Sequence, residues 1–322
     1  MIKLSVCIPI YGVERYIEKC LRSLFEQTLK DSIEYIFVND STYDSSMEIL
    51  HDILDEYQER TDQVRIIEHE SNSGLGATRL TALKAARGEY VIFCDSDDWV
   101  ATDMYETMLD KATATGSDIV VCDYYMDYGD RKTEVALQDV TTAEHFVMDM
   151  MENRVHCGVW NKMIRRDLYM ARESVFEQGI DMWEDVCAII PVISEAKSIS
   201  HVNRPLYYYN QQNALSYTHN LKDASLNSMK NVIARLERYF VENKPQLLPG
   251  INFMKLTVKL NCLLNTTGDK QQEYVSLYPE ADISIMRYDK LSPYWRIALM
   301  AVRYNQLWLF NFLKRMNNFL KR

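Results

Sequence analysis

The feature that most constrains this chain is a regular alternation of short apolar runs and amphipathic segments over its first 122 residues. The runs are rich in β-branched and aromatic side chains, which is typical of strands buried on both faces of a parallel sheet. The segments between them carry apolar residues at helical spacing, as Leu21 and Leu24 illustrate. The sequence therefore predicts an α/β fold with a mostly parallel sheet and right-handed crossovers. The expected strands span residues 3–10, 33–38, 64–68, 89–94 and 118–122.

The rest of the chain divides into two parts. Residues 123–215 are less regular and rich in aromatic side chains, and we expect them to complete the sheet. From about residue 221 the pattern becomes helical, with helices expected at 221–243, 251–265 and 270–279. The sequence therefore predicts an α/β domain over 1–218 and a helical C-terminal region over 219–322.

The charge distribution narrows the choice of partners. The whole chain carries a net charge of −10, which argues against binding to nucleic acid. Residues 290–322 contain seven Lys and Arg residues and no Asp or Glu, so the remainder carries −17. In this basic tail, the apolar side chains expected on one helical face are Leu309, Phe312, Leu313, Met316, Phe319 and Leu320. A basic amphipathic segment over 291–322 suits an anionic membrane surface, but packing on the acidic body or a dimer contact explains the same pattern.

The seven cysteines are scattered, and no Cys-x-x-Cys pair occurs. This usage is typical of reduced thiols in a cytoplasmic protein rather than of a disulfide framework. The chain shows no signal peptide and no apolar run of about 18 residues, so we expect no membrane-spanning helix. We therefore expect a cytoplasmic protein, or one held peripherally on the inner face of the cell membrane.

Three carboxylates follow the fourth expected strand, because Asp95, Asp97 and Asp98 come directly after the run Tyr90–Cys94. Carboxylates this close repel one another and need a cation or several donors to hold them. In open α/β sheets, ligands bind at the carboxyl ends of the strands, and Mg²⁺ often shares one or two carboxylates with substrate phosphates. The motif therefore indicates a site for a divalent metal and a diphosphate. It is equally consistent with the start of a helix, because Asp favours N-caps and first turns.

Three further segments carry groups suited to binding a nucleotide. Tyr11 offers a ring on which a base can stack, although the preceding Pro9 can simply end a strand. Asp40 can accept a hydrogen bond from a base or a ribose, and it is also a common turn residue. The segment Asn72–Arg79 has glycines that let a backbone approach a ligand, and an arginine that either neutralises phosphate or lies in solvent. Neither a P-loop nor a GxGxxG sequence occurs.

A second acidic pair, Glu184 and Asp185, lies between Trp183 and the apolar run Val186–Ile190. A carboxylate beside apolar walls can have a raised pKa and act as a general base. The simpler interpretation is a pair of acidic residues in the first turn of a helix, where the helix dipole favours them.

Taken together, these residues resemble the family 2 glycosyltransferases, which have the nucleotide-sugar-binding GT-A fold. The resemblance runs from Leu4 to about Thr218. Its motifs are Ser5–Tyr11, Phe37–Ser41 in place of an Asp-Asp-Gly-Ser turn, Gly88–Trp99 around the metal motif, Val159–Lys162, Trp183–Asp185, and Pro205–Tyr209 with Ser216. It implies a Rossmann-like, mostly parallel sheet flanked by helices.

The resemblance also implies a role for individual positions. Nucleotide-sugar-binding residues would be Pro9, Tyr11, Glu14, Asp40, Arg79, Asp95, Ser96 and Asp97, with Asp97 and Asp95 also holding Mg²⁺ or Mn²⁺. Asp185 would be the catalytic base. The acceptor side would be formed by Trp160, Lys162, Trp183, Glu184 and Asp98.

The chain departs from the family pattern at three positions. Asn39 stands where an Asp is usual, Ser41 where a Gly is usual, and Leu80 where an Asn follows the arginine. These changes bear on the preference for uracil and for the donor sugar more than on catalysis. The Gln-x-x-Arg-Trp signature of processive members is absent, which favours the transfer of single sugars.

The resemblance implies an inverting transfer from a nucleotide sugar, with UDP the expected nucleotide, to a hydroxyl of a saccharide or lipid-linked acceptor in bacterial surface polysaccharide synthesis. Two other functions fit parts of the sequence. A sugar-phosphate nucleotidyltransferase would normally carry a Gly-rich basic loop near its N-terminus, where this chain has only Gly12 and Arg15. A non-catalytic nucleotide- or sugar-binding scaffold would not need both Asp97 and Asp185.

Overall fold

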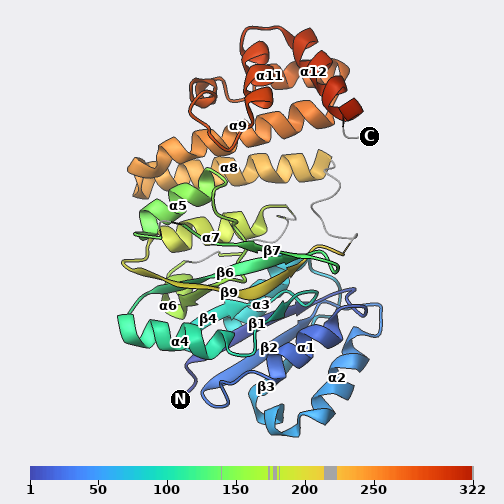
Figure 1. The fold of residues 1–322 in the computed structure, drawn as a ribbon, viewed down its shortest axis with the longest axis vertical. Coiled ribbons are helices and arrows are strands. Elements are labelled where there is room, and N and C mark those ends of the chain that lie inside the picture. The colour runs from blue at the N-terminus through green and yellow to red at the C-terminus, as the bar shows by residue number, and fades with distance from the viewer. Residues whose placement is uncertain (139, 173–174, 177–179, 181, 214–222, 321–322) are drawn as a thin grey trace. The chain divides into compact units, whose positions relative to one another are not determined.

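The chain forms two compact units. The computed structural model describes residues 1–138, 140–172, 175–176, 180, 182–213 and 223–320. The first unit comprises Met1–Phe146 and Cys157–Ser216, and the second comprises Val147–His156 and Tyr217–Arg322 (Figure 1). The predicted boundary after residue 218 lies outside the described residues, and residues 147–156, predicted in the first domain, group with the second unit. In the described part of the chain, every helix is too short or too polar to cross a membrane.

The first unit is built on one mixed sheet, whose described strands run in the order β3-β2-β1-β4-β8-β6-β9-β5. β1 pairs in parallel with β2 and β4, and β2 pairs in parallel with β3. β8 is antiparallel to β4 and β6, β9 is parallel to β6, and β7 adds an antiparallel pair to β6. The strands are β1 Leu4–Ile10, β2 Ile33–Asn39, β3 Val64–Glu68, β4 Tyr90–Phe93, β5 Trp99–Val100, β6 Ile119–Asp127, β7 Lys132–Val135, β8 Lys162–Arg165 and β9 Ile199–Asn210.

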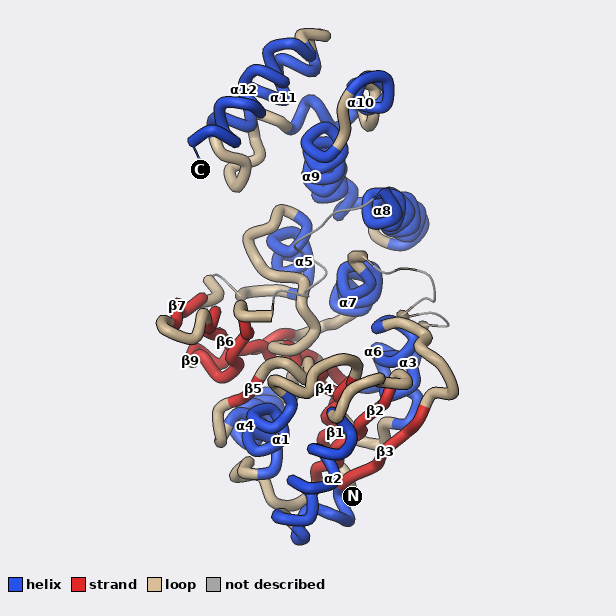
Figure 2. The backbone as a smooth tube through the Cα atoms, turned by 90° about the vertical axis from the view of Figure 1, so that its right-hand side faces the viewer, coloured by secondary structure: helices blue, strands red, loops and turns tan. Residues whose placement is uncertain are grey.

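Helices cover both faces of this sheet (Figure 2). All residues of β1 are buried, and Leu4, Val6 and Ile8 share a core with Leu21 and Leu24 of α1. On the opposite face, Phe93 packs edge-to-face on Tyr169 of α6. Burial on both faces explains why these strands read as unbroken apolar runs. The helices are α1 Ile17–Phe25, α2 Ser46–Glu56, α3 Leu75–Ala85, α4 Met104–Thr115, α5 Ala143–Met151, α6 Arg166–Met170 and α7 Glu184–Ser194, with the 3₁₀ segment η1 at Gln58–Gln63.

The second unit is helical, as the sequence predicts. Its own core contains Leu256 and Leu263 of α9, Leu299 of α11 and Phe310 of α12. The described elements are α8 Asp223–Asn243, η3 Pro245–Leu247, α9 Leu248–Asn265, α10 Gly268–Val275, η4 Pro279–Ser284, α11 Pro293–Arg303 and α12 Leu307–Leu320.

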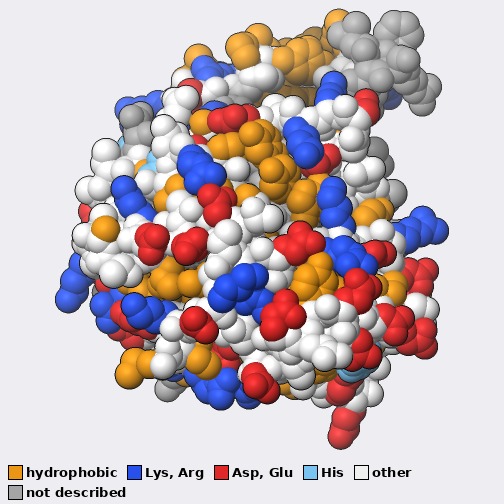
Figure 3. Space-filling view, turned by 60° about the horizontal axis from the view of Figure 1, so that its bottom comes forward, with side chains coloured by type: hydrophobic (Ala, Val, Ile, Leu, Met, Phe, Trp, Pro, Cys, Tyr) orange, Lys and Arg blue, Asp and Glu red, His pale blue; other side chains and the backbone are white. Residues whose placement is uncertain are grey.

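The predicted α/β sheet flanked by helices is confirmed as a mixed sheet, and the strands of residues 123–215 complete it. β1 to β4 pair in parallel as predicted, whereas β5, β7 and β8 join the sheet through antiparallel pairs. One feature of the sheet differs from the expected pattern. The turn after β4 leads into the two-residue strand β5, which pairs with β9 before α4 begins. Charged groups of both signs are interspersed over one face of the molecule, with apolar side chains between them (Figure 3).

Candidate functional site

The motif of three aspartates forms a tight turn between β4 and β5. The Asp98 backbone N–H donates to the Asp95 carbonyl (3.0 Å). Ser96 Oγ donates to the Pro9 carbonyl (2.6 Å), which ties the turn to the end of β1. Because α4 begins only after β5, the alternative that these aspartates start a helix is wrong.

Asp98 lies in the interior of the first unit, with 1% of its surface exposed. Its Oδ2 accepts a hydrogen bond from the Tyr207 hydroxyl (2.6 Å), and its Oδ1 accepts one from the Asn210 backbone N–H (2.7 Å). Burial, assisted by the charges of Asp97 and Asp95, holds the pKa of Asp98 well above its ordinary value. The prediction that Asp98 faces the acceptor is corrected, because both of its oxygens are bonded to β9 in an enclosed site.

Asp97 is less enclosed than Asp98. Its Oδ2 accepts a hydrogen bond from Asn213 Nδ2 (2.9 Å). Burial and the charge of Asp95 raise the pKa of Asp97, so a cation would stabilise its charged form. Within the described residues, no group of three or more His, Cys, Asp and Glu side chains is arranged to hold a metal ion. A divalent ion at Asp97 and Asp95 would therefore need further oxygen ligands from a bound diphosphate, as Mg²⁺ sites often have.

Arg79 joins this turn to the second acidic pair. It lies on α3, which begins after Gly74 with a φ of 87°. Its guanidinium donates to Asp95 Oδ1 (2.8 Å) and to Glu184 Oε1 (2.8 Å). The Arg79 side chain is only 4% exposed, so the alternative of a solvent-facing arginine is wrong. Its Nε is buried and has no hydrogen-bond partner in the part of the chain that the structure describes.

Glu184 and Asp185 form the first turn of α7, as the simpler interpretation predicts. The preceding Trp183 has a left-handed backbone conformation, with a φ of 67°, which turns the chain into the helix. Burial raises the pKa of Glu184 to about 7, with a further contribution from the charge of Asp185. Burial also raises the pKa of Asp185, although the charge of Arg79 opposes this shift. The position of both residues in the first turn of a helix therefore does not exclude a general base, because a carboxylate with a raised pKa is suited to proton transfer.

The end of β2 is organised by Asp40, which is buried. Its carboxylate accepts hydrogen bonds from the backbone N–H groups of Ser73 (2.8 Å) and Gly74 (2.9 Å), and its Oδ1 lies 2.7 Å from His69 Nδ1. Asp40 thus fixes the loop that leads to Arg79. The next residue, Ser41, has a φ of 58°, so this turn retains the left-handed conformation for which a glycine would be the ordinary choice.

Tyr11 and Tyr43 form an exposed aromatic pair beyond the ends of β1 and β2. Their ring centroids are 5.6 Å apart at an interplanar angle of 74°. Tyr11 is 45% exposed and Tyr43 is 74% exposed, so both rings are available to a planar ligand. Glu14, which is also predicted to bind the nucleotide sugar, is exposed, and its Oε2 accepts a hydrogen bond from the Ser45 backbone N–H (3.2 Å) before α2.

Trp160 and Lys162 are enclosed rather than exposed to an acceptor. Trp160 is 2% exposed and stacks on Tyr207, with ring centroids 4.4 Å apart. Lys162 is fully buried, and its Nζ donates to the Gly158 carbonyl (2.7 Å) and to Asn161 Oδ1 (2.8 Å). Burial lowers the pKa of Lys162 to about 8. These two predicted acceptor contacts are therefore corrected to interior residues that support the aromatic half of the sheet, whereas Trp183 and Glu184 are partly exposed.

Sequence reasoning assigned no role to several residues that shape this site. Tyr207 and Asn210 of β9, with Asn213 just after that strand, hold the aspartate turn through hydrogen bonds. Tyr43 adds a second ring beside Tyr11. The aromatic run before Asn210 was a usable signal, because alternate residues of a strand reach opposite faces of a sheet. The isolated Asn213 and Tyr43 gave no comparable signal.

Comparison with protein families identifies one match, to the glycosyl transferase family 2 model, over residues 5–173. A similar curated protein is an uncharacterized glycosyltransferase, EpsJ, from Bacillus subtilis, which is 36% identical over 214 residues. That alignment covers 64% of this chain and 60% of the relative. The chain thus matches about three fifths of the length of this relative.

Two solved structures extend the comparison to the fold. The crystal structure of S. aureus TarS 1–349 in complex with UDP-GlcNAc matches with a TM-score of 0.73 at 18% identity, covering 98% of this chain and 92% of that chain. The mannosyltransferase PcManGT from Pyrobaculum calidifontis, in complex with GDP-Man and Mn²⁺, matches with a TM-score of 0.51 at 15% identity, covering 95% and 87%. The predicted GT-A fold with a helical C-terminal region is confirmed by the match to TarS.

Proposed function

Because the chain belongs to glycosyl transferase family 2, whose model matches more than half of it, we propose that it is a glycosyltransferase. The proposed reaction moves a single sugar, with inversion at the anomeric carbon, from a nucleotide sugar to an acceptor hydroxyl. A UDP-sugar is the proposed donor. The UDP-GlcNAc bound in the TarS crystal structure supports UDP as the first nucleotide to test.

The observation that carries this proposal is the double ion pair of Arg79. Through its two N–H···O contacts of 2.8 Å, Arg79 brings Asp95 of the aspartate turn and Glu184 of α7 to one guanidinium. Asp185, the proposed base, follows Glu184 directly in the first turn of the same helix. The group proposed to remove a proton is thus held beside the turn proposed to receive the diphosphate, as a transfer between two bound substrates requires.

In the proposed mechanism, Asp185 accepts the proton of the acceptor hydroxyl. As that proton leaves, the hydroxyl oxygen forms a bond to the anomeric carbon, and the bond from this carbon to the diphosphate oxygen breaks on the opposite side. Burial favours the neutral form of Asp185 and makes it a stronger base, whereas Arg79 limits the shift and keeps the carboxylate available. A positioned general base of this kind typically contributes about 10²–10⁴ in rate.

On the donor side, the rings of Tyr11 and Tyr43 are proposed to contact the base. Asp40, which fixes the loop at Ser73, and Pro9 in the first strand are proposed to complete this side. Asp97 and Asp95 fit a Mg²⁺ or Mn²⁺ ion shared with the diphosphate, because burial and then the charge of Asp95 raise the pKa of Asp97, and a cation would offset both effects. When bound, such an ion would neutralise charge that develops on the leaving diphosphate.

On the acceptor side, the partly exposed Trp183 and Glu184 remain in the proposal, together with Asp185. The proposed acceptor is a saccharide or a lipid-linked oligosaccharide used in bacterial surface polysaccharide synthesis. We place this reaction on the cytoplasmic side of the cell membrane. The acceptor class and the location rest on the family resemblance. Once the donor is known, saccharides and lipid-linked oligosaccharides are the acceptors to test.

The first test is calorimetric titration of UDP into the purified full chain, with and without Mn²⁺. We expect saturable binding that Mn²⁺ strengthens and that Asp97→Ala weakens, because the variant removes a proposed ligand of the shared ion. Asp110→Ala is the matched control, since it removes an exposed carboxylate on α4.

The result that contradicts the donor assignment is an absence of binding by UDP, GDP, CDP and dTDP under both conditions. A different result would indicate a non-catalytic scaffold: a nucleotide binds, but its sugar conjugate is neither hydrolysed nor transferred to any candidate acceptor.

A further inference from the structure

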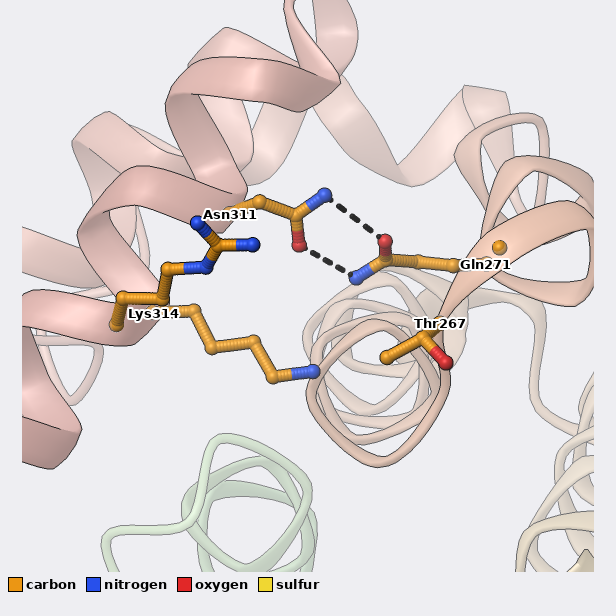
Figure 4. A pocket seen from close by; sticks show the side chains of 6 residues that line it. Thr267, Gln271, Asn311 and Lys314 are labelled. Carbon is orange, nitrogen blue, oxygen red and sulfur yellow. Dashed lines mark hydrogen bonds between the residues drawn. The ribbon is translucent and has the colours of Figure 1, made fainter.

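Helix α12 is held to the second unit by one of its faces. Phe310 is fully buried, and Leu313 packs against the same core. Asn311 and Gln271 exchange two hydrogen bonds of 3.0 Å through their side-chain amides, which joins α12 to α10 (Figure 4). Lys314 Nζ donates to carbonyls at the end of α9, including that of Thr266 (3.1 Å). This inner face therefore has apolar and polar partners within the unit.

The outer face of α12 carries a second set of apolar side chains. Trp308 is 68% exposed, Phe312 is 54% exposed and Met316 is 42% exposed. Residues four apart lie one above another on a helix, so these three form a stripe about 12 Å long. The predicted tail face thus divides in the structure, because Leu313 packs inward while Phe312 and Met316 point outward. The side chains of Phe319 and Leu320 lie outside the described residues.

A basic side chain lies at one end of this outer stripe. Arg315 is exposed beside Met316, and the sequence from 290 to 322 holds seven basic residues and no acidic one. Asp269 and Glu273 of the neighbouring α10 offset part of this charge. A helix with an aromatic apolar stripe and basic residues matches the chemistry of an anionic lipid surface, in which apolar groups enter the acyl boundary and cations meet the headgroups.

A second copy of this chain is a poorer partner for the same stripe. The exposed parts of the three side chains amount to on the order of 350 Å², on the basis of the areas that such residues usually bury. A stable dimer generally buries about 800 Å² on each partner.

We propose that α12 lies in the plane of an anionic bilayer, with Trp308, Phe312 and Met316 inserted at the acyl boundary and Arg315 at the level of the headgroups. This inference goes beyond the proposed glycosyl transfer and does not depend on it. It concerns only the second unit, and nucleotide binding is measured separately on the same preparation.

The test is sedimentation of the full chain with vesicles of phosphatidylglycerol and phosphatidylcholine, and with vesicles of phosphatidylcholine alone. We expect binding to the anionic vesicles that weakens with added salt. The triple variant Trp308→Ser, Phe312→Ser, Met316→Ser is expected to lose this binding. Arg315→Gln is expected to bind the anionic vesicles about fivefold more weakly, since each basic residue near such a surface contributes about that factor.

The matched control is Ile283→Ser with Met286→Ser, which removes two equally exposed apolar side chains of the second unit that lie outside α12. This control is expected to bind vesicles like the original chain. Circular dichroism checks the fold of each variant, and Phe312→Ser alone replaces the triple variant should that variant unfold.

Equal sedimentation of the original chain and the folded α12 variants overturns the proposal. So does a concentration-dependent dimer that is lost in the triple variant without any vesicle binding, because the stripe would then be an interface between copies. Neither result bears on UDP binding.

Discussion

The aspartate turn contacts two networks that differ in how completely they satisfy their polar groups. On one side, Arg79 bridges Asp95 and Glu184, yet its Nε lacks a partner among the described residues, and the Asp95 side chain is 24% exposed. On the other side, both oxygens of Asp98 are bonded and only 1% of the residue is exposed. The first network is incomplete and open to a ligand, whereas the second is closed.

This difference shows that adjacent carboxylates of one motif serve different purposes. Asp98 fastens the turn to β9 through Tyr207, so that the turn has a fixed place at the end of the sheet. Asp95 and Asp97 are only partly buried, and they are the residues at which we propose that a cation and a diphosphate bind. A buried network with every group satisfied is expected to govern stability, and an unsatisfied one is expected to govern binding and reaction. Three substitutions test this division, and a fourth tests the enclosed position of Lys162.

The largest effect is expected for Asp185→Asn. Removal of the proposed base should lower the turnover of a UDP-sugar by about 10²–10⁴-fold, because the hydroxyl proton then has no positioned acceptor. UDP affinity, measured by calorimetry, should stay within twofold of the original value. Unchanged turnover in a correctly folded variant would remove Asp185 from the mechanism.

The next effect is expected for Asp98→Asn, and it concerns stability. The amide keeps one acceptor oxygen but presents a donor where a second acceptor is needed, so a buried group loses its partner. We expect the free energy of unfolding, from urea titration, to fall by about 1–3 kcal/mol. Asp97→Asn is the matched control and should change stability much less. Equal losses for the two variants would contradict the distinction between the networks.

A smaller effect is expected in the pH dependence of stability, through Glu184. Its pKa is raised from 4.5 to about 7, so between these values the folded chain keeps a proton that the unfolded chain has released. Stability should therefore fall as the pH rises through this window, and Glu184→Gln should flatten the fall. Thermal melting from pH 5 to 8 measures both chains. Because Glu184 and Asp185 titrate together, the midpoint belongs to the pair.

Lys162 is expected to change stability with pH in the opposite direction, at higher pH. Burial lowers its pKa from 10.5 to about 8, so the unfolded chain holds a proton that the folded chain has already released. Stability should therefore rise between pH 8 and 10, and Lys162→Met should lose this rise. The same melting experiment, extended to pH 10, provides the measurement. Parallel curves for the two chains would mean that Lys162 is not enclosed as described.

The sequence predicted the framework of the fold well, because a strand buried on both faces, such as β1, has an unbroken run of apolar residues. It also located the aspartate turn and the acidic pair of α7. It did not predict that Arg79 would bond Glu184, which lies 105 residues away, nor that Tyr207 would enclose Asp98 from a strand 109 residues downstream. Such contacts depend on tertiary packing, which no local pattern records.

The tail illustrates the same limit within a single helix. Periodicity placed Leu313 and Phe312 on one apolar face, yet Leu313 packs on the core while Phe312 is exposed. The two residues are adjacent, and an α-helix turns by about 100° from one residue to the next, so a broad apolar face can be divided between two surroundings. The hydrophobic pattern predicts how wide the apolar face of the helix is, but it does not predict which surface each residue of that face contacts.

The bridge through Arg79 has a consequence for synthesis of the chain. Its near contact, with Asp95, joins residues 16 apart, whereas its far contact, with Glu184, joins residues 105 apart. A ribosome adds about 5–20 residues per second, so the second carboxylate emerges roughly 5–20 s after the arginine. During that interval the nascent chain can complete β1 to β4 and pair Arg79 with Asp95, but it lacks the helix that carries the proposed base. The proposed donor half of the site can therefore form first, and the proposed base joins it only when α7 docks.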